Sequence, residues 1–297
     1  MSISLKEAEW LRDYIFSVHR MHKLQSLVLS GLENTEILFW LLHRLPNLES
    51  ITLKNCLFEG IWASTSLAAH EKIGVVVQLK ELIINNLRYL QNIGFEHDLL
   101  LQRVERLVVS ECVKLKSLLP FAVSFSYLTY LEVTNCSGLR NLMTSSTAMT
   151  LVQLTIMKVS LCQGIEKIVA EEEKTQVIEF RQLKAIELVS LPSLTCFCSS
   201  QMCDLKFPSL ENLVVSDCLL METFSEVQSA PNLRKIHVAA GEKDRWYWEG
   251  DLNTTLRKLS TDKVCIYKKS LSSLHRNYFS FECKFSVDVL LLDNYVI

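Results

Sequence analysis

The cysteines are the residues whose type and spacing could support chemistry in this chain of 297 residues, which contains ten of them. Three lie close together as Cys196-x-Cys198-x4-Cys203, where a zinc ion would require a fourth ligand brought in by folding. The C-x-C spacing is not that of the usual zinc knuckle, and this disfavours a metal-dependent enzyme. The seven histidines are scattered, and no G-x-S-x-G or H-E-x-x-H motif occurs. We therefore predict no enzyme: no catalytic residue, no metal site and no bound cofactor.

Five other cysteines recur at one shared position of a longer pattern, and they are Cys56, Cys112, Cys136, Cys162 and Cys218. A metal ladder or a redox row is the functional interpretation of such a series. Metal sites, however, use clustered ligands with short C-x2–4-C spacing, whereas these thiols lie one or more repeats apart. We therefore expect a structural role, in which a small inward thiol fits under the end of a strand and bonds weakly to the turn backbone.

The pattern around these cysteines is a repeat of apolar residues. In its fullest copy, over residues 128–142, it reads L-x-x-L-x-V-x-x-C-x-x-L-x-x-L. Nine copies follow one another at intervals of 23 to 31 residues, in or near the period of roughly 20–29 residues that leucine-rich repeats have. Their leading residues are Leu24, Leu48, Leu79, Val104, Leu128, Leu154, Leu183, Leu210 and Leu233.

Each copy contains an alternation that indicates a strand. In Leu131-Glu132-Val133 the two apolar residues point to one face and the glutamate points to the other. One strand cannot bury its apolar row alone, so stacked copies share a parallel sheet with a continuous core behind it. Helix signals occur in the return segments after Asn34 and after Ser145. We therefore predict an α/β fold, a leucine-rich-repeat solenoid with a curved parallel sheet on its concave face and short helices and loops on its convex face.

The repeat divides the chain into three parts. Residues 1–23 are expected to form an N-terminal cap or lead-in helix, and residues 24–260 an array of about nine leucine-rich repeats. Residues 261–297 are expected to form a non-repeat C-terminal tail. The tail is a cap, a disordered segment or an artefact of gene prediction, and these alternatives stay open.

The outward strand residues form the candidate binding face. Each repeat contributes one strand, or rung, to the sheet. Nine rungs spaced about 4.8 Å apart form a surface roughly 40 Å long, which is enough for a standard protein interface. Tyr130 and Arg106 are of residue types enriched at interface hot spots. Smaller outward positions such as Thr52 and Ser216 line the same surface. The candidate contact residues are Lys54, Glu81, Arg106, Val108, Tyr130, Glu132, Ile156, Lys158, Glu187, Asn212, Lys235 and His237.

Composition limits the class of partner. The chain contains 31 Lys+Arg against 33 Asp+Glu, a net charge of −2, so it lacks the positive excess that is typical of nucleic-acid binding. The N-terminal residues show no apolar core of signal-peptide type, and no apolar run approaches the ~18 residues of a membrane span. We therefore expect a cytoplasmic protein with reduced cysteines and a protein partner, and neither nucleic acid nor a membrane as partner.

Several segments resemble a known family at positions that periodicity alone leaves free. They are CSGLRNLMTSSTA at residues 136–148, GIEKIVAEEE at 164–173, LPSLTCFC at 191–198, FPSLE at 207–211 and WYWEGDLN at 246–253. Through them the chain, over roughly residues 20–260, resembles the leucine-rich-repeat region of plant disease-resistance proteins. More specifically, it is similar to the coiled-coil type of nucleotide-binding leucine-rich-repeat proteins.

The resemblance implies a protein-interaction module of plant innate immunity. Such regions sense a pathogen effector, directly or through a guarded host protein, and hold the nucleotide-binding switch domain of their receptor in an off state. The chain contains no G-x-x-x-x-G-K-[ST] phosphate loop, so we expect a receptor fragment or a truncated paralogue, and the ATP binding and defence signalling of the family are not carried over to it. The alternative is a leucine-rich-repeat substrate-recognition adaptor of a ubiquitin ligase, or another scaffold. That adaptor class requires an F-box-like segment before the repeats, and residues 1–20 are too short to hold one.

Overall fold

The computed structural model describes the repeat region of the chain. The described residues are 2–4, 23–33, 35, 37–38, 41–42, 45–61, 79–93, 103–118, 124–170, 172, 176–198, 203–225, 227–240 and 243–261. Met1–Ser260 form one compact unit, to which the following description applies. The expected tail, residues 261–297, lies outside the described residues apart from Thr261, so the alternatives for its role stay open.

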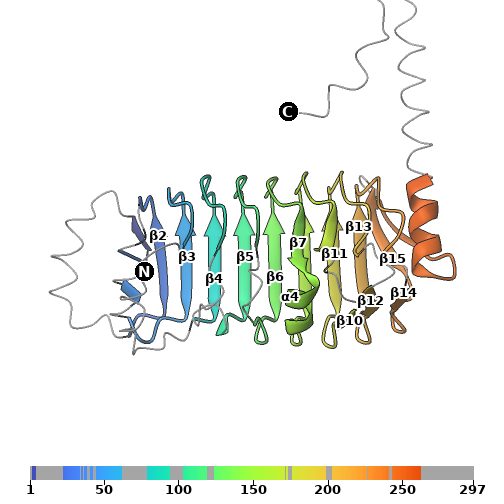
Figure 1. The fold of residues 1–297 in the computed structure, drawn as a ribbon, viewed down its shortest axis with the longest axis horizontal. Helices are drawn as coiled ribbons and strands as arrows, with labels where there is room; N and C mark the ends of the chain where they lie inside the picture. The colour runs from blue at the N-terminus through green and yellow to red at the C-terminus, as the bar shows by residue number, and fades with distance from the viewer. Residues whose placement is uncertain are drawn as a thin grey trace, which may run out of the picture. The chain divides into compact units, whose positions relative to one another are not determined.

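One large parallel sheet runs through the whole unit (Figure 1). All neighbouring strands in it are parallel except the last pair, β15 and β16, which is antiparallel. The eleven strands, in spatial order, are β1 (Ser2–Ser4), β2 (Ser26–Ser30), β3 (Ser50–Lys54), β4 (Glu81–Asn85), β5 (Arg106–Ser110), β6 (Tyr130–Thr134), β8 (Ile156–Ser160), β11 (Ala185–Val189), β13 (Asn212–Ser216), β15 (Ile236–Ala240) and β16 (Lys243–Tyr247).

The nine predicted repeat strands are all present, which confirms the leucine-rich-repeat solenoid. Successive strands pair without a shift, so that Leu107 of β5 lies opposite Leu131 of β6, which in turn lies opposite Met157 of β8. Strand β1 is an addition that the repeat pattern did not predict: residues 2–4, within the expected N-terminal cap or lead-in helix, pair with β2. Residues 5–22 of that segment lie outside the described residues.

The core lies behind the sheet. In most repeat strands the second and fourth residues are buried and the other three are only partly buried, as the alternation predicts. Leu131 and Val133, for example, are fully buried. Since burial of one leucine stabilises the fold by about 1.5–3 kcal/mol and each inward residue contacts the neighbouring rungs, the stability of a rung depends on the rungs beside it.

The return segments contain more strands and fewer helices than expected. Two segments that follow the turns, β7 (Asn141–Thr144) and β9 (Lys167–Ala170), form one parallel ladder. A further ladder contains β10 (Gln176–Glu179), β12 (Cys203–Lys206) and β14 (Val227–Ser229). These ladders form because rungs stacked in register also bring their return segments side by side, where unpaired backbone N–H and C=O groups find partners.

Helical structure occurs at both predicted sites and at the end of the array. Helix α4 (Ser145–Thr150) begins at the predicted serine, with the side chain of Thr144 as its N-cap. Residues 37–38 and 41–42 are helical, whereas the predicted cap Asn34 lies outside the described residues. Residues 252–261 form a further helix, which packs Leu252, Leu256 and Leu259 on the core.

A residue in the left-handed conformation follows each repeat strand from β2 to β13. Its φ angle lies between 52° and 72°. In the seven turns from Gly31 to Ser190, the N–H of this residue donates to the carbonyl of the last strand residue in the next rung, as from Asn55 to Asn85 at 3.1 Å. The turn therefore extends the ladder by one bond beyond the strand. The residues at this position are Gly31, Asn55, Asn86, Glu111, Asn135, Leu161, Ser190 and Asp217.

Leu161 is the residue least suited to this turn. Asparagine and glycine adopt the left-handed conformation readily, whereas most other residues lose about 1–2 kcal/mol in it. The Leu161 side chain is 52% exposed, so little burial offsets that cost. We predict that Leu161→Asn raises the free energy of unfolding by about 1 kcal/mol in urea denaturation. The control is Leu220→Asn, because Leu220 is equally exposed and has no positive φ. An equal gain in both variants would mean that backbone strain is not the cause.

Gly164 lies where two successive turns stack most tightly. A Cβ atom there would lie 2.3 Å from the carbonyl oxygen of Ser137 and 2.9 Å from that of Leu139. Backbone atoms cannot move aside without disturbing the ladder, so Gly164→Ala is expected to destabilise the protein by about 1–3 kcal/mol in urea denaturation. Ser193 occupies the corresponding position in the next rung, and Ser193→Ala should change stability by less than about 0.5 kcal/mol. Unchanged stability of the Gly164 variant would contradict this packing.

Candidate functional site: the outward face of the sheet

The in-register strands arrange their outward side chains in three columns that cross the sheet. The first column contains the first residue of each strand. The second column contains the third residue, and the third column contains the fifth residue. Neighbouring members of one column lie on adjacent strands, about 4.8 Å apart. Residues some 25 positions apart in the sequence therefore become direct neighbours. We call the surface formed by these columns the sheet face.

The structure describes all twelve predicted contact residues and places them on or beside this face. Lys54, Asn212 and Lys235 are exposed, and the other nine are partly buried. Lys235 directly precedes β15, and each of the others lies within a strand of the large sheet. Their role in binding stays a prediction.

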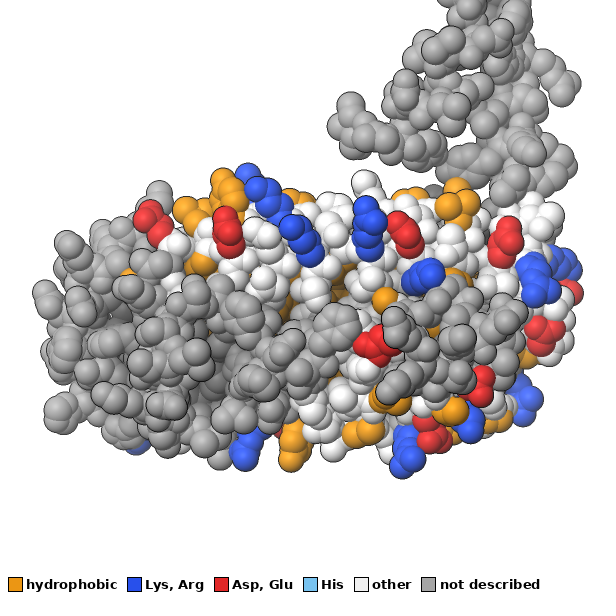
Figure 2. All heavy atoms as spheres, in the orientation of Figure 1, with side chains coloured by type: hydrophobic (Ala, Val, Ile, Leu, Met, Phe, Trp, Pro, Cys, Tyr) orange, Lys and Arg blue, Asp and Glu red, His pale blue; other side chains and the backbone are white. Residues whose placement is uncertain are grey.

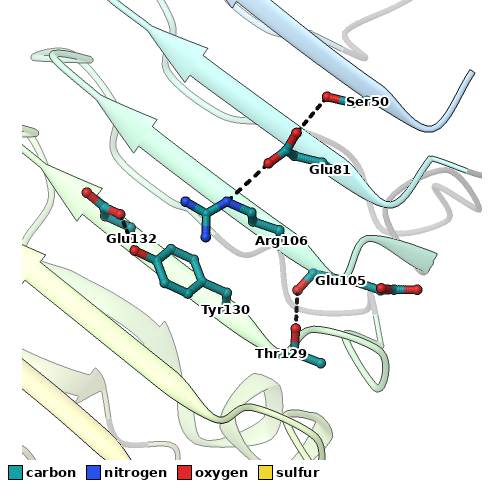
Figure 3. Close-up of polar contacts among 7 residues, drawn as sticks. All are labelled: Ser50, Glu81, Glu105, Arg106, Thr129, Tyr130 and Glu132. Carbon is teal, nitrogen blue, oxygen red and sulfur yellow. Dashed lines mark hydrogen bonds and ion pairs between the residues drawn. The ribbon is translucent and has the colours of Figure 1, made fainter. Parts of the chain in front are cut away.

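The first column contains a chain of side-chain contacts across four rungs, from β3 to β6 (Figure 3). The Ser50 hydroxyl donates to Glu81 Oε2 at 2.7 Å, and Arg106 Nε lies 3.1 Å from Glu81 Oε1. The guanidinium carbon of Arg106 lies 3.7 Å from the centre of the Tyr130 ring. A cation over an aromatic ring is an attractive arrangement, so Arg106 is held on one side by charge and on the other by the ring.

The second column continues this network. The Tyr130 hydroxyl donates to Glu132 Oε2 at 2.5 Å. Burial, together with this bond to a carboxylate, raises the pKa of Tyr130, so the phenol stays protonated at neutral pH. Further along, Lys158 Nζ lies 2.8 Å from Glu187 Oε1, and the hydrogen bond to Glu187 raises the pKa of Lys158. Charges in the middle of the sheet face are therefore neutralised by partners on adjacent rungs.

The amino-terminal part of the second column is apolar instead. Val28, Ile83 and Val108 occupy it together with Thr52, in the register Val28–Thr52–Ile83–Val108. Thr52 and Ser216 occupy the predicted outward positions, since they pair with outward residues of the adjacent strands. Only 9% of Thr52 and 1% of Ser216 is exposed, however, so neither is an accessible contact residue. Both are small side chains beside larger outward neighbours, which the alternation of a single strand does not reveal.

Trp246 is a residue of this face that the repeat pattern missed. It lies on β16 opposite His237, with the ring centres 4.7 Å apart, and Lys235 Nζ lies 3.8 Å from the centre of its ring. Half of the side chain is exposed. Tryptophan is enriched at hot spots, so residue type was the available signal. The residue lies beyond the last repeat, where the periodicity no longer assigns an outward side.

The five repeat cysteines are buried at the ends of their strands. Each thiol lies 3.2–3.5 Å from the carbonyl oxygen two residues earlier, to which it donates. Burial raises the pKa of Cys56. The adjacent thiols of Cys112 and Cys162, together with burial, raise the pKa of Cys136. The raised pKa keeps Cys56 and Cys136 protonated, which makes these two thiols poor nucleophiles and metal ligands. The hydrogen bonds with Cys136 instead lower the pKa of Cys112 and of Cys162.

The group of Cys196, Cys198 and Cys203 shows no metal-binding geometry among the described residues. Cys196 and Cys198 are buried, and the side chain of Cys203 lies outside the described residues. Within the described ranges, no three His, Cys, Asp or Glu side chains come close enough to hold a metal ion. The neighbouring core is aromatic instead: Phe197 stacks on Phe224 at a ring-centre distance of 4.6 Å.

Charges of both signs are mixed on the described surface. Figure 2 shows basic and acidic side chains interspersed along the edge at which the strands end, without a large area of one sign. None of the helices in the described residues is long and apolar enough to cross a membrane.

Comparison with known proteins identifies the repeat. Residues 2–125 and residues 122–240 each match the family described as plant disease resistance protein RPS2-like, leucine-rich repeats. Curated proteins and solved structures gave no match. The two matched segments cover more than half of the chain and contain all nine repeat strands. The chain therefore belongs to the RPS2-like leucine-rich-repeat family of plant disease resistance proteins, whose repeats form a protein-interaction module.

Proposed function

We propose that this chain recognises protein partners in plant innate immunity through the sheet face. The partner is a pathogen effector, a guarded host protein or the nucleotide-binding switch domain of a receptor, and the setting is the cytoplasm. In the last case the repeats hold the switch domain in its off state. The observation that carries the proposal is the preformed network from Ser50 through Glu81 and Arg106 to Tyr130.

The network supports binding because it fixes large side chains before a partner arrives. Ordering a flexible side chain at an interface costs about 0.5–1.5 kcal/mol. Arg106 already contacts Glu81 and Tyr130 in the unbound chain, so less of this cost remains when it contacts a partner. Arginine and tyrosine are also the residue types that carry much of the energy of protein interfaces.

The balance of charge favours a protein partner. Glu81 and Arg106 neutralise each other, as do Lys158 and Glu187. A surface for nucleic acid would instead leave several cations free to replace counterions on phosphates. An interface of mixed apolar, hydroxyl and paired charged groups is typical of protein–protein contacts.

The test is binding of the purified chain to a panel of probes. The panel contains nucleotide-binding domains of coiled-coil-type resistance receptors from the source plant, and effectors of its pathogens. We expect one member to bind, and Tyr130→Ala to weaken that binding at least about tenfold by calorimetry. The control is Tyr127→Ala, because Tyr127 is 51% exposed but belongs to a turn outside the three columns. Absence of binding across the panel, or equal losses in the two variants, would contradict the proposal.

A further inference from the structure

A second surface lies on the turns that follow β3, β4 and β5. Each of these three consecutive turns exposes one large apolar side chain: Leu57 is 49% exposed, Tyr89 45% and Val113 44%. Lysines accompany them, since Lys54 ends β3 and Lys114 follows Val113. Along this edge Figure 2 shows hydrophobic side chains beside basic ones. We call Leu57, Tyr89, Val113, Lys54, Lys114 and Lys116 the turn patch.

Among the described residues, only these three turns form an uninterrupted run of exposed apolar side chains. Single exposed leucines also follow β8 and β13, Leu161 at 52% and Leu220 at 56%, but the turns after β6 and β11 present none. The corresponding positions after β6 and β8 are Ser137-Gly138 and Gln163-Gly164, which present no large apolar side chain. The turn fold therefore does not require an exposed Leu, Tyr or Val. Exposed apolar side chains in neighbouring positions, with no structural need for them, are typical of an interaction surface.

The turn patch is rigid. The N–H of Asn55 donates to Asn85, and the N–H of Asn86 donates to Ser110, so both turns continue the ladder of the sheet. A side-chain hydrogen bond of 2.6 Å joins Asn86 Nδ2 to Asn55 Oδ1. Arg88 Nε in turn donates to Asn86 Oδ1 at 3.2 Å. A surface held in this way loses little conformational entropy when a partner binds.

The charges of the turn patch are unsatisfied, unlike those of the sheet face. Lys114 Nζ lies 4.8 Å from the centre of the Tyr89 ring, which orders the cation without neutralising it. Within the described part of the chain, Lys54 and Lys116 form no ion pair. Three carboxylates belong to the same turns: Glu33, next to the Leu32 carbonyl that accepts from the N–H of Leu57, Glu59, which accepts from Gln91 at 3.2 Å, and Glu111. Lys54, Lys114, Lys116 and Arg88 outnumber these three by one, and the two lysines Lys114 and Lys116 follow Val113.

From this geometry we propose that the turn patch docks an acidic amphipathic helix of a partner protein. Three rungs about 4.8 Å apart match the rise of about 5.4 Å between successive turns of a helix, so apolar residues one turn apart meet Leu57, Tyr89 and Val113 in succession. Carboxylates flanking that apolar row then pair with Lys54, Lys114 and Lys116. This docking site borders the sheet face, with which it shares Lys54, but its apolar residues Leu57, Tyr89 and Val113 lie outside the three columns.

The test uses a synthetic helical peptide with leucines on one face and glutamates beside them, and a second peptide with lysines in place of the glutamates. We expect the acidic peptide to bind the intact chain in calorimetry, more weakly as salt concentration rises, and the basic peptide not to bind. Tyr89→Ser and Lys114→Glu should each lower the affinity about fivefold or more, with the circular-dichroism spectrum unchanged. Equal binding of the two peptides would overturn the proposal.

Matched variants separate this site from others. Leu220→Ser removes a 56% exposed leucine from the corresponding turn after β13, and Tyr130→Ala alters the sheet face. Both should leave peptide affinity unchanged, so failure here is distinguishable from failure of the function proposed for the sheet face. Vesicles of phosphatidylserine and phosphatidylcholine test a lipid surface instead. The proposal would also be overturned if the chain bound the vesicles but not the acidic peptide, and if Tyr89→Ser and Lys114→Glu each abolished binding to the vesicles.

Discussion

The structure depends on the backbone ladder that joins each repeat strand to the next without a shift. Slipping one strand by a single residue would turn its buried row outward and its polar row into the core, because side chains alternate along a strand. Leu107, Leu131 and Met157 lie opposite one another in successive rungs, so the apolar row itself fixes the register. No rung has a complete core of its own. Each one is stable because the rungs on both sides bury its leucines.

The same register determines what the surface can do. It places Glu81, Arg106 and Tyr130 on adjacent strands, so that residues distant in sequence form one contact network. It also brings successive turns so close that Gly164 has no room for a side chain beside Ser137. The turn backbones of successive rungs are therefore closely packed on one another. Function and stability share one cause here, because the ladder that buries the core also fixes the positions of the outward side chains.

The periodicity was enough to predict the nine repeat strands and their outward residues, because period-two alternation is a local signal. Features that need contacts between rungs were not predictable in this way. The ladders of the return segments depend on which segments become neighbours, and the burial of Thr52 depends on Val28 and Ile83 in the adjacent strands. Helix α4 was recognisable from its serines, yet its first turn is also capped by Glu172, a residue of the next rung, which accepts from the N–H of Ser146 at 2.9 Å.

The sheet face and the turn patch differ in how their charges are satisfied, and the backbone geometry explains the difference. On the sheet, outward side chains of adjacent strands are parallel and about 4.8 Å apart, so opposite charges such as Lys158 and Glu187 meet directly. On the turns, side chains leave the backbone in different directions, and Lys114 contacts the Tyr89 ring instead of a carboxylate. A paired charge contributes shape and hydrogen bonds to an interface, whereas an unpaired cation attracts an anionic partner over a longer range. One solenoid can thus present two surfaces of different selectivity without any change in the core that supports them.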